Sequence, residues 1–117
     1  MRKIEISTEV QKDIEKFDGR ETQWTKAIIR YLEDEHNSIE TIKQKFKPLH
    51  GDLCGYYKAK HRGFGIRLVF RILSDTELIM YIEKLKPNEV ITECIQLLAV
   101  GKRDKIYDLA KKRSDNK

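Results

Sequence analysis

The stretch from Cys54 to Arg71, CGYYKAKHRGFGIRLVFR, constrains the fold more than any other part of this sequence. Apolar and charged residues alternate on both sides of a glycine-containing segment, and a period of two is typical of strands with one buried face. Gly63 and Gly65 bracket Phe64, and glycine favours the tight turn of a hairpin. We therefore predict two antiparallel strands joined by this turn.

The two faces of the predicted hairpin differ in chemistry. The apolar face, expected to point into the core, holds Tyr57, Ala59, Ile66, Leu68 and Phe70. The opposite face carries Lys58, Lys60, Arg67 and Arg71. Arginine and lysine side chains bind phosphate oxygens through charge-assisted hydrogen bonds. A rigid strand pair with several cations on one side is therefore suited to holding a phosphate group.

Positive charge is concentrated in two short segments of the chain. The 117 residues have a net charge of +5, yet residues 41–71 carry +7 and residues 101–113 carry +4, whereas residues 1–40 and 72–100 each carry −3. Clustered lysine and arginine are typical of proteins that bind nucleic acids. A solvated basic face without a partner is the alternative interpretation.

Length and composition favour a single domain, residues 1–117, in the cytoplasm. The two cysteines, Cys54 and Cys94, form no C-x-x-C motif and no cluster with histidine, which favours a reducing compartment over disulfides or a metal site. No apolar segment is long enough for a signal peptide or a membrane span. We expect no membrane partner, no metal and no small-molecule cofactor.

The first 48 residues are expected to be mainly helical after one short strand. Residues 2–6 alternate as a strand does, Thr8-x-x-Gln11 resembles a capping box, and Asp18-Gly19 is expected to end the first helix. A further short helix begins after Ser38 and is ended by Pro48. The second helix is indicated by an apolar stripe at helical spacing: Trp24, Ala27, Ile28, Tyr31 and Leu32.

The last third of the chain is expected to contain two strands and a final helix. We predict strands over Thr76–Ile82 and Ile91–Val100, a turn over residues 86–89, and a helix over Arg103–Arg113. Helices followed by antiparallel strands predict an α+β fold. This fold would have a twisted, mostly antiparallel sheet of four to five strands, two N-terminal helices packed on one face and a short C-terminal helix.

Three motifs, in this order, resemble the RelE/ParE toxin superfamily, and its RelE branch most closely. They are the K-x-K that ends KPLHGDLCGYYKAK, the strand GIRLVFRI, and the segment LLAVGKRDKIYDLAKKR. The resemblance covers about residues 44–72 and 97–113. It implies a RelE-like toxin that enters the ribosomal A site and cuts mRNA without a metal. It also implies a cognate antitoxin, whose acidic or amphipathic segment would cover the basic face or displace the last helix.

The resemblance assigns the catalytic cluster to Lys58, Lys60, Arg67, Arg103 and Tyr107. Lys60 is expected to act as the general base, Arg67 to hold the scissile phosphate, Tyr107 to orient the 2′-OH and Arg103 to stabilise the leaving oxygen. A free lysine has a pKa of about 10.4. A lysine base therefore needs neighbouring cations that lower its pKa, and the hairpin supplies several.

Residues beside the basic segments are expected to contact RNA, because aromatic and guanidinium planes stack on bases. The predicted RNA-binding residues are His61, Arg62, Phe64, Arg71 and Lys102. His50 and His61 could also assist acid–base chemistry. Structural roles are the alternatives: solvent-facing lysines on a strand, an arginine that caps a helix, and a tyrosine in the core.

Two features depart from relatives. Arg103 and Tyr107 are only four residues apart, which would place both on one helix face, and residues 75–92 form a longer segment, expected to add a strand or lengthen a hairpin. Two other functions stay open. A ParE-like inhibitor of DNA gyrase would not need the catalytic cluster, and a basic RNA-binding or regulatory module would keep the fold without activity.

Overall fold

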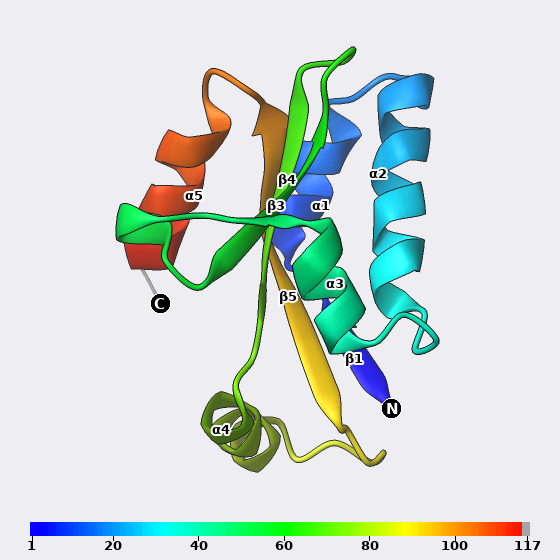
Figure 1. The fold of residues 1–117 in the computed structure, drawn as a ribbon, viewed down its shortest axis with the longest axis vertical. Coiled ribbons are helices and arrows are strands. Elements are labelled where there is room, and N and C mark those ends of the chain that lie inside the picture. Colours follow the sequence, from blue (N-terminus) through cyan, green and yellow to red (C-terminus); the bar gives the residue numbers. More distant parts are fainter. Residues whose placement is uncertain (116–117) are drawn as a thin grey trace.

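In a computed structural model, which describes residues 1–115, five strands form one mixed sheet in the order β1-β5-β4-β3-β2 (Figure 1). β1 runs parallel to β5, and all other neighbouring strands are antiparallel. The α+β class and the mostly antiparallel sheet predicted from the sequence are confirmed. The strands are β1 (Arg2–Glu5), β2 (Lys47–Pro48), β3 (Tyr56–His61), β4 (Ile66–Ile72) and β5 (Glu93–Lys102).

Helices lie on both faces of the sheet, with α5 on the opposite side from α2 (Figure 1). The helices are α1 (Thr8–Glu15), α2 (Gly19–Glu33), α3 (Ile39–Lys45), α4 (Asp75–Leu85) and α5 (Ile106–Asp115), and Gly51–Leu53 form one 3₁₀ turn, η1. Within residues 1–115, no helix combines the length and the apolarity needed to cross a lipid bilayer.

Two apolar cores follow from this arrangement. The larger core lies between the sheet and α1, α2 and α3, and it includes the buried side chains of Val10, Leu32, Ile42, Leu68 and Phe70. The smaller core lies between the sheet and α5, and it includes Leu53, Val69, Ala99, Ile106 and Ala110. Because side chains of the hairpin alternate as predicted, one face of the sheet contributes to the larger core and the other face is covered in part by α5.

The first two helices begin at polar caps. The Ser7 hydroxyl accepts a hydrogen bond from the Val10 N–H at 3.3 Å, so α1 begins one residue earlier than the predicted box implies. Asp18 does not end α1, which stops at Glu15; it caps α2 in a capping box with Glu21. Ala27 of the predicted apolar stripe is exposed, because the buried side of α2 is centred nearer to Ile29.

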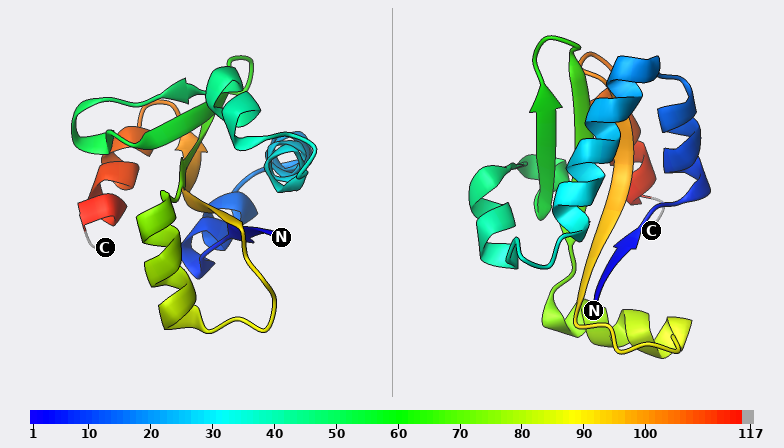
Figure 2. Two further views of the ribbon diagram at one scale, coloured as in Figure 1. Left: turned by 60° about the horizontal axis from the view of Figure 1, so that its bottom comes forward. Right: turned by 90° about the vertical axis from the view of Figure 1, so that its right-hand side faces the viewer.

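The prediction of a strand over Thr76–Ile82 is wrong, because this segment belongs to helix α4. Ser74 and Glu77 form a capping box, with the Glu77 carboxylate accepting from the Ser74 N–H at 2.9 Å. Lys86 ends the helix in a left-handed conformation. No residue of α4 is buried, and Figure 2 shows α4 at the end of the sheet, apart from the other helices. The local caps therefore outweigh the β-propensity of its apolar residues.

The last two elements begin a few residues later than predicted. β5 spans Glu93–Lys102 rather than 91–100, and α5 spans Ile106–Asp115 rather than 103–113. A turn over residues 103–105 joins them. Arg103 consequently lies outside the helix that carries Tyr107.

On the side that faces away from β4, the second half of β5 has no neighbouring strand, because β1 stops at Glu5. Two side chains from opposite ends of the sequence bind the backbone there. The Asp13 carboxylate accepts from the Val100 N–H at 3.1 Å, and the Arg113 guanidinium donates to the Leu98 carbonyl at 3.0 Å. Arg113 also donates to both oxygens of Asp13, at 2.6 and 2.9 Å. This ion pair thus joins α1, β5 and α5.

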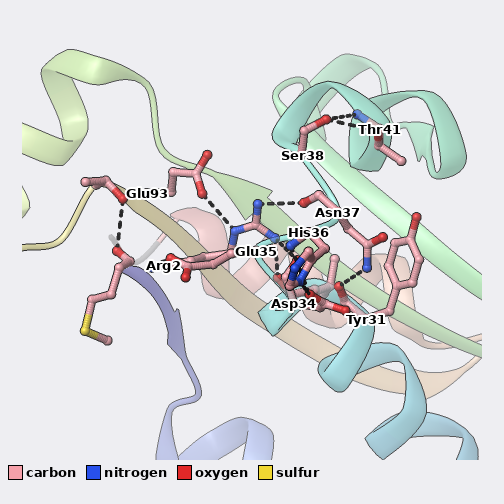
Figure 3. A network of polar contacts seen from close by, with 12 residues as sticks. Arg2, Tyr31, Asp34, Glu35, His36, Asn37, Ser38, Thr41 and Glu93 are labelled. Atoms are coloured by element: carbon pink, nitrogen blue, oxygen red, sulfur yellow. Dashed lines mark hydrogen bonds and ion pairs between the residues drawn. The ribbon is translucent and has the colours of Figure 1, made fainter.

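Arg2 joins β1 to three other segments from a buried position (Figure 3). Its guanidinium donates to the carbonyl oxygens of Leu32 and Asp34, each at 2.9 Å, and to that of Asn37 at 2.6 Å. Its Nε pairs with the Glu93 carboxylate at 3.0 Å. The carbonyls at the end of α2 are satisfied in this way, so Arg2 has a structural role.

Candidate active site

Three of the predicted catalytic residues lie together on the sheet face that α5 partly covers. In the β3–β4 hairpin Lys60 is opposite Arg67 and Lys58 is opposite Val69, and on the other side of β4 Arg67 is opposite Gly101. Directly opposed residues point to the same face of a sheet. A Cβ placed on Gly101 would lie 3.5 Å from Ile106 of α5. The face that Gly101 shares with Arg67 is therefore the face on which α5 packs.

Within the described part of the chain, Arg67 is buried and has no negatively charged partner. The residue is only 8% exposed, and its Nη1 donates a hydrogen bond to the neighbouring Ile66 carbonyl at 3.1 Å. No carboxylate of residues 1–115 forms an ion pair with it. A buried cation is costly unless an anion compensates it. The guanidinium fork is therefore suited to an external anion of carboxylate or phosphate geometry.

Lys60 lies at the centre of the positive charge. Lys47 of β2, followed by Arg62 in the hairpin turn, lowers the pKa of Lys60 below its ordinary value of 10.5. Partial burial and the charges of Lys58 on β3 and Arg67 on β4 act in the same direction. The neutral form of Lys60 is thus more accessible than that of a free lysine, as a general base requires.

Tyr107 contacts both the smaller core and the basic face. It is half-buried against that core, and the Lys58 ammonium lies 5.7 Å from the centre of its ring. Lys58 and Tyr107 line an open cavity of about 500 Å³ together with His50, Asp52, Asp108 and Lys111. The sequence had suggested His50 only as an aid to acid–base chemistry, because a turn residue has no periodic pattern that indicates the direction of its side chain.

Arg103 lies at the same end of the sheet as the hairpin turn. Its N–H donates to the Gly65 carbonyl at 2.8 Å, and its side chain is exposed. The prediction that Arg103 and Tyr107 share one face of a helix is wrong, because α5 begins at Ile106. The two separate basic segments nevertheless meet in space, through the pairing of β4 with β5.

Of the five residues predicted to bind RNA, only Arg62 is exposed beside Lys60 without an ion pair within residues 1–115. His61 and Phe64 belong to the α2 side of the hairpin. Their rings stack at 4.1 Å, His61 lies edge-on to Trp24 at 5.8 Å, and the His61 Nδ1 accepts from the Phe64 N–H at 3.1 Å. These aromatic rings therefore stabilise the turn.

Lys102 and Arg71 have acidic partners within the fold. Lys102 pairs with Glu21 of α2 and also donates to the Phe64 carbonyl at 3.3 Å. Arg71 pairs with Glu77 of α4 at 3.1 Å and donates to the Gln96 amide oxygen at 2.7 Å. Both side chains thus differ from Arg67, whose charge no carboxylate of the described residues balances.

The structure adds two lysines to the site, and the sequence pattern had predicted neither of them as a site residue. Lys47 is opposite Lys58 in the β2–β3 pair, and Lys45 precedes it at the end of α3. The sequence had predicted both within the short helix that follows Ser38 and that Pro48 ends. A two-residue strand has too few residues to show a period of two, so only the pairing with β3 places them. Residues 1–115 contain no group of three or more His, Cys, Asp or Glu side chains that could hold a metal ion.

No protein-family model matches the chain, and no curated protein matches its sequence. Among solved structures, the RelBE2 toxin–antitoxin complex from Mycobacterium tuberculosis contains a similar chain, with 19% identity, a TM-score of 0.53, and coverage of 86% of this chain and 96% of that one. The YoeB/ParE toxin from Agrobacterium tumefaciens has 18% identity and a TM-score of 0.42, with coverage of 86% and 97%. The first match establishes a shared fold, so the RelE-like fold predicted from the motifs is confirmed.

Proposed function

We propose that this protein is the toxin of a type II toxin–antitoxin pair and cuts mRNA on the ribosome by acid–base catalysis. One observation carries the proposal. Arg67 is buried without a carboxylate partner among the described residues, and Lys58 and Lys60 lie beside it on the same face. A fold alone supports many functions. The proposal therefore rests on this site and on the motifs that resemble RelE-like toxins.

The main contribution of the site would be electrostatic. A phosphodiester bound at Arg67 gains negative charge on its non-bridging oxygens as the 2′-oxygen attacks, and the guanidinium fork can donate two parallel hydrogen bonds to them. Lys58 and Lys60 add positive charge from the neighbouring strand. The cluster thus binds the transition state more strongly than the ground state, which is what accelerates a reaction.

Proton transfer is assigned to the groups around this phosphate. Lys60 removes the proton of the 2′-OH, the 2′-oxygen forms a bond to phosphorus, and the bond from phosphorus to the 5′-oxygen breaks. The products are a 2′,3′-cyclic phosphate and a 5′-OH end. Tyr107 orients the 2′-OH, and Arg103, exposed at the rim, stabilises the leaving oxygen, which takes its proton from solvent.

The partner that would keep this protein inactive is an antitoxin with an acidic segment. Residues 41–71 carry a net charge of +7, and the uncompensated cations of this segment form the candidate site. A segment rich in Asp and Glu would be attracted to that surface and would exclude RNA from it.

The variants Lys60→Ala and Arg67→Ala test the function. Induction of the wild-type protein is expected to arrest growth, and primer extension on a translated message should reveal cuts in the A-site codon. Loss of one transition-state donor typically costs about 10²-fold or more in rate, so both variants should cut at least about 10²-fold more slowly. Lys26→Ala, at an exposed position of α2, is the control and should cut normally.

Other outcomes of the same experiment would contradict the proposed site or indicate another function. Full cleavage by both variants contradicts the proposed site. Growth arrest with DNA damage and intact messages would indicate an inhibitor of gyrase. A protein that neither cuts messages nor damages DNA would be a binding module with a toxin fold.

A further inference from the structure

A second pocket lies at the outer edge of the sheet, next to the candidate active site. It has a volume of about 320 Å³ and is open to solvent between β3, β2 and the end of α3. Four lysines line it, namely Lys45, Lys47, Lys58 and Lys60, and Phe46 and Ala59 belong to its apolar floor. No acidic side chain lines this pocket.

The lysines of this pocket lack the acidic partners that four other cations of the described chain have. Lys102, Lys111, Arg71 and Arg113 each pair with a carboxylate. The four pocket lysines form no ion pair within the described chain. Like charges so close together repel one another, which is consistent with the lowered pKa of Lys60. An anion bound among the lysines would relieve this repulsion.

The positions of Lys45 and Lys47 are set by the fold. The Lys45 ammonium lies 5.0 Å from the centre of the Tyr31 ring and 6.0 Å from that of Phe46, so aromatic faces hold its charge at the pocket. Lys47 is placed opposite Lys58 by strand pairing. Lys58 and Lys60 border both this pocket and the face of Arg67, so the two sites are continuous.

We propose that this pocket binds a backbone phosphate of the RNA strand next to the phosphate held by Arg67. The inference rests on the proposed function, since it extends the RNA path from β4 across β3 to the edge strand β2. Ammonium groups act as point charges and suit phosphate oxygens. A peptide strand added to β2 would find only two residues to pair with, one of them Pro48, which has no N–H to donate.

Binding of single-stranded RNA tests the proposal without any cleavage. The probe is a fluorescent oligonucleotide of about 12 nucleotides with 2′-O-methyl sugars, which removes the nucleophile. Its affinity is measured by anisotropy at several salt concentrations. The double variant Lys45→Gln/Lys47→Gln is expected to bind more weakly, and the slope of log K against log[salt] should become shallower by about 0.7 for each phosphate that the variant no longer neutralises.

The matched control removes the same charge elsewhere. Lys12→Gln/Lys26→Gln changes two exposed lysines of α1 and α2 and is expected to keep the wild-type slope. All four substituted lysines are exposed, so thermal unfolding should be unchanged in both variants. A double variant at Lys45 and Lys47 that retains the slope of the control overturns the proposal. Loss of binding to oligoglutamate with unchanged RNA binding overturns it too, and assigns the pocket to an acidic peptide.

The result is independent of the nuclease test. If the wild-type protein cuts no message but its RNA binding depends on Lys45 and Lys47, the phosphate-binding pocket is supported and the proposed nuclease function is contradicted. If the wild-type protein cuts messages but the double variant binds RNA as the control does, the nuclease function is supported and the phosphate-binding pocket is contradicted.

Discussion

Lysines that look alike in the sequence meet different surroundings in the fold. Lys60 faces other cations, which lower its pKa, with Lys47 the strongest of them. Lys111 lies 3.0 Å from Asp52, and the hydrogen bond to this carboxylate raises its pKa. Lys102 is paired with Glu21. Of Lys60 and Lys111, only Lys60 has an environment that favours release of its proton.

The variant Lys47→Gln tests this environment through the pH dependence of cleavage. The base must be neutral, so the rate rises with pH until the pKa of Lys60 is passed. Removal of the Lys47 charge raises that pKa and should move the rising limb of the profile to higher pH. Single-turnover cleavage measured from neutral to alkaline pH, with Lys26→Gln as control, decides the matter. An unchanged profile would show that Lys60 is not the base or that Lys47 does not influence it.

Among the elements, α4 has the weakest connection to the rest of the molecule. None of its residues is buried, and the large apolar side chains of Ile79, Met80 and Leu85 are between 49% and 64% exposed. Its helical state comes from local signals, namely the capping box of Ser74 with Glu77 and the left-handed Lys86. These signals are present in the sequence, where apolar content alone had indicated a strand.

The stability of α4 is expected to depend on its cap rather than on its apolar side chains. The substitution Met80→Gln should change the free energy of unfolding by less than about 0.5 kcal/mol, because the side chain is exposed. Ser74→Ala should reduce the helicity of this segment and cost up to about 1 kcal/mol. Urea denaturation and amide hydrogen exchange over residues 75–85 provide the measurements. A larger effect of Met80→Gln than of Ser74→Ala would contradict this account.

At the scale of the whole molecule, two arginines connect distant parts of the chain. Arg2 joins the first strand to the end of α2, and Arg113 joins the last helix to Asp13 of the first helix. Both act on backbone groups that no strand or helix partner satisfies. Such groups are costly when buried, so the fold depends on these side chains more than on its surface ion pairs.

Asp13 and Asp52 form a matched pair for testing this difference. Asp13→Ala leaves the Val100 N–H without its acceptor, and leaves the Arg113 guanidinium with only the exposed Glu9 carboxylate, 3.3 Å away, as an ionic partner. This change should reduce the free energy of unfolding by about 3 kcal/mol. Asp52→Ala breaks only the exposed pair with Lys111 and should cost less than about 1 kcal/mol. Urea denaturation of the two variants is the measurement. Equal losses in the free energy of unfolding would show that the pair of Asp13 with Arg113 stabilises the fold no more than the exposed pair of Asp52 with Lys111.

The sequence by itself determined the features that depend on near neighbours along the chain. Alternation over residues 56–61 and 66–72 established the hairpin and its basic face, and three motifs indicated the RelE-like fold that the structural match confirmed. Helix caps were also present locally, although the box at Ser74 was overlooked and the one at Asp18 was assigned to the end of a helix.

Only the tertiary structure decided which cations act together. Strand pairing brings Lys47 beside Lys58, whereas acidic groups from α2 and α4 neutralise Lys102 and Arg71. The physical reason is that the charge state and the accessibility of a side chain depend on groups within a few ångströms. In this protein those groups come from residues far away in the sequence, so their identities cannot be obtained from local periodicity.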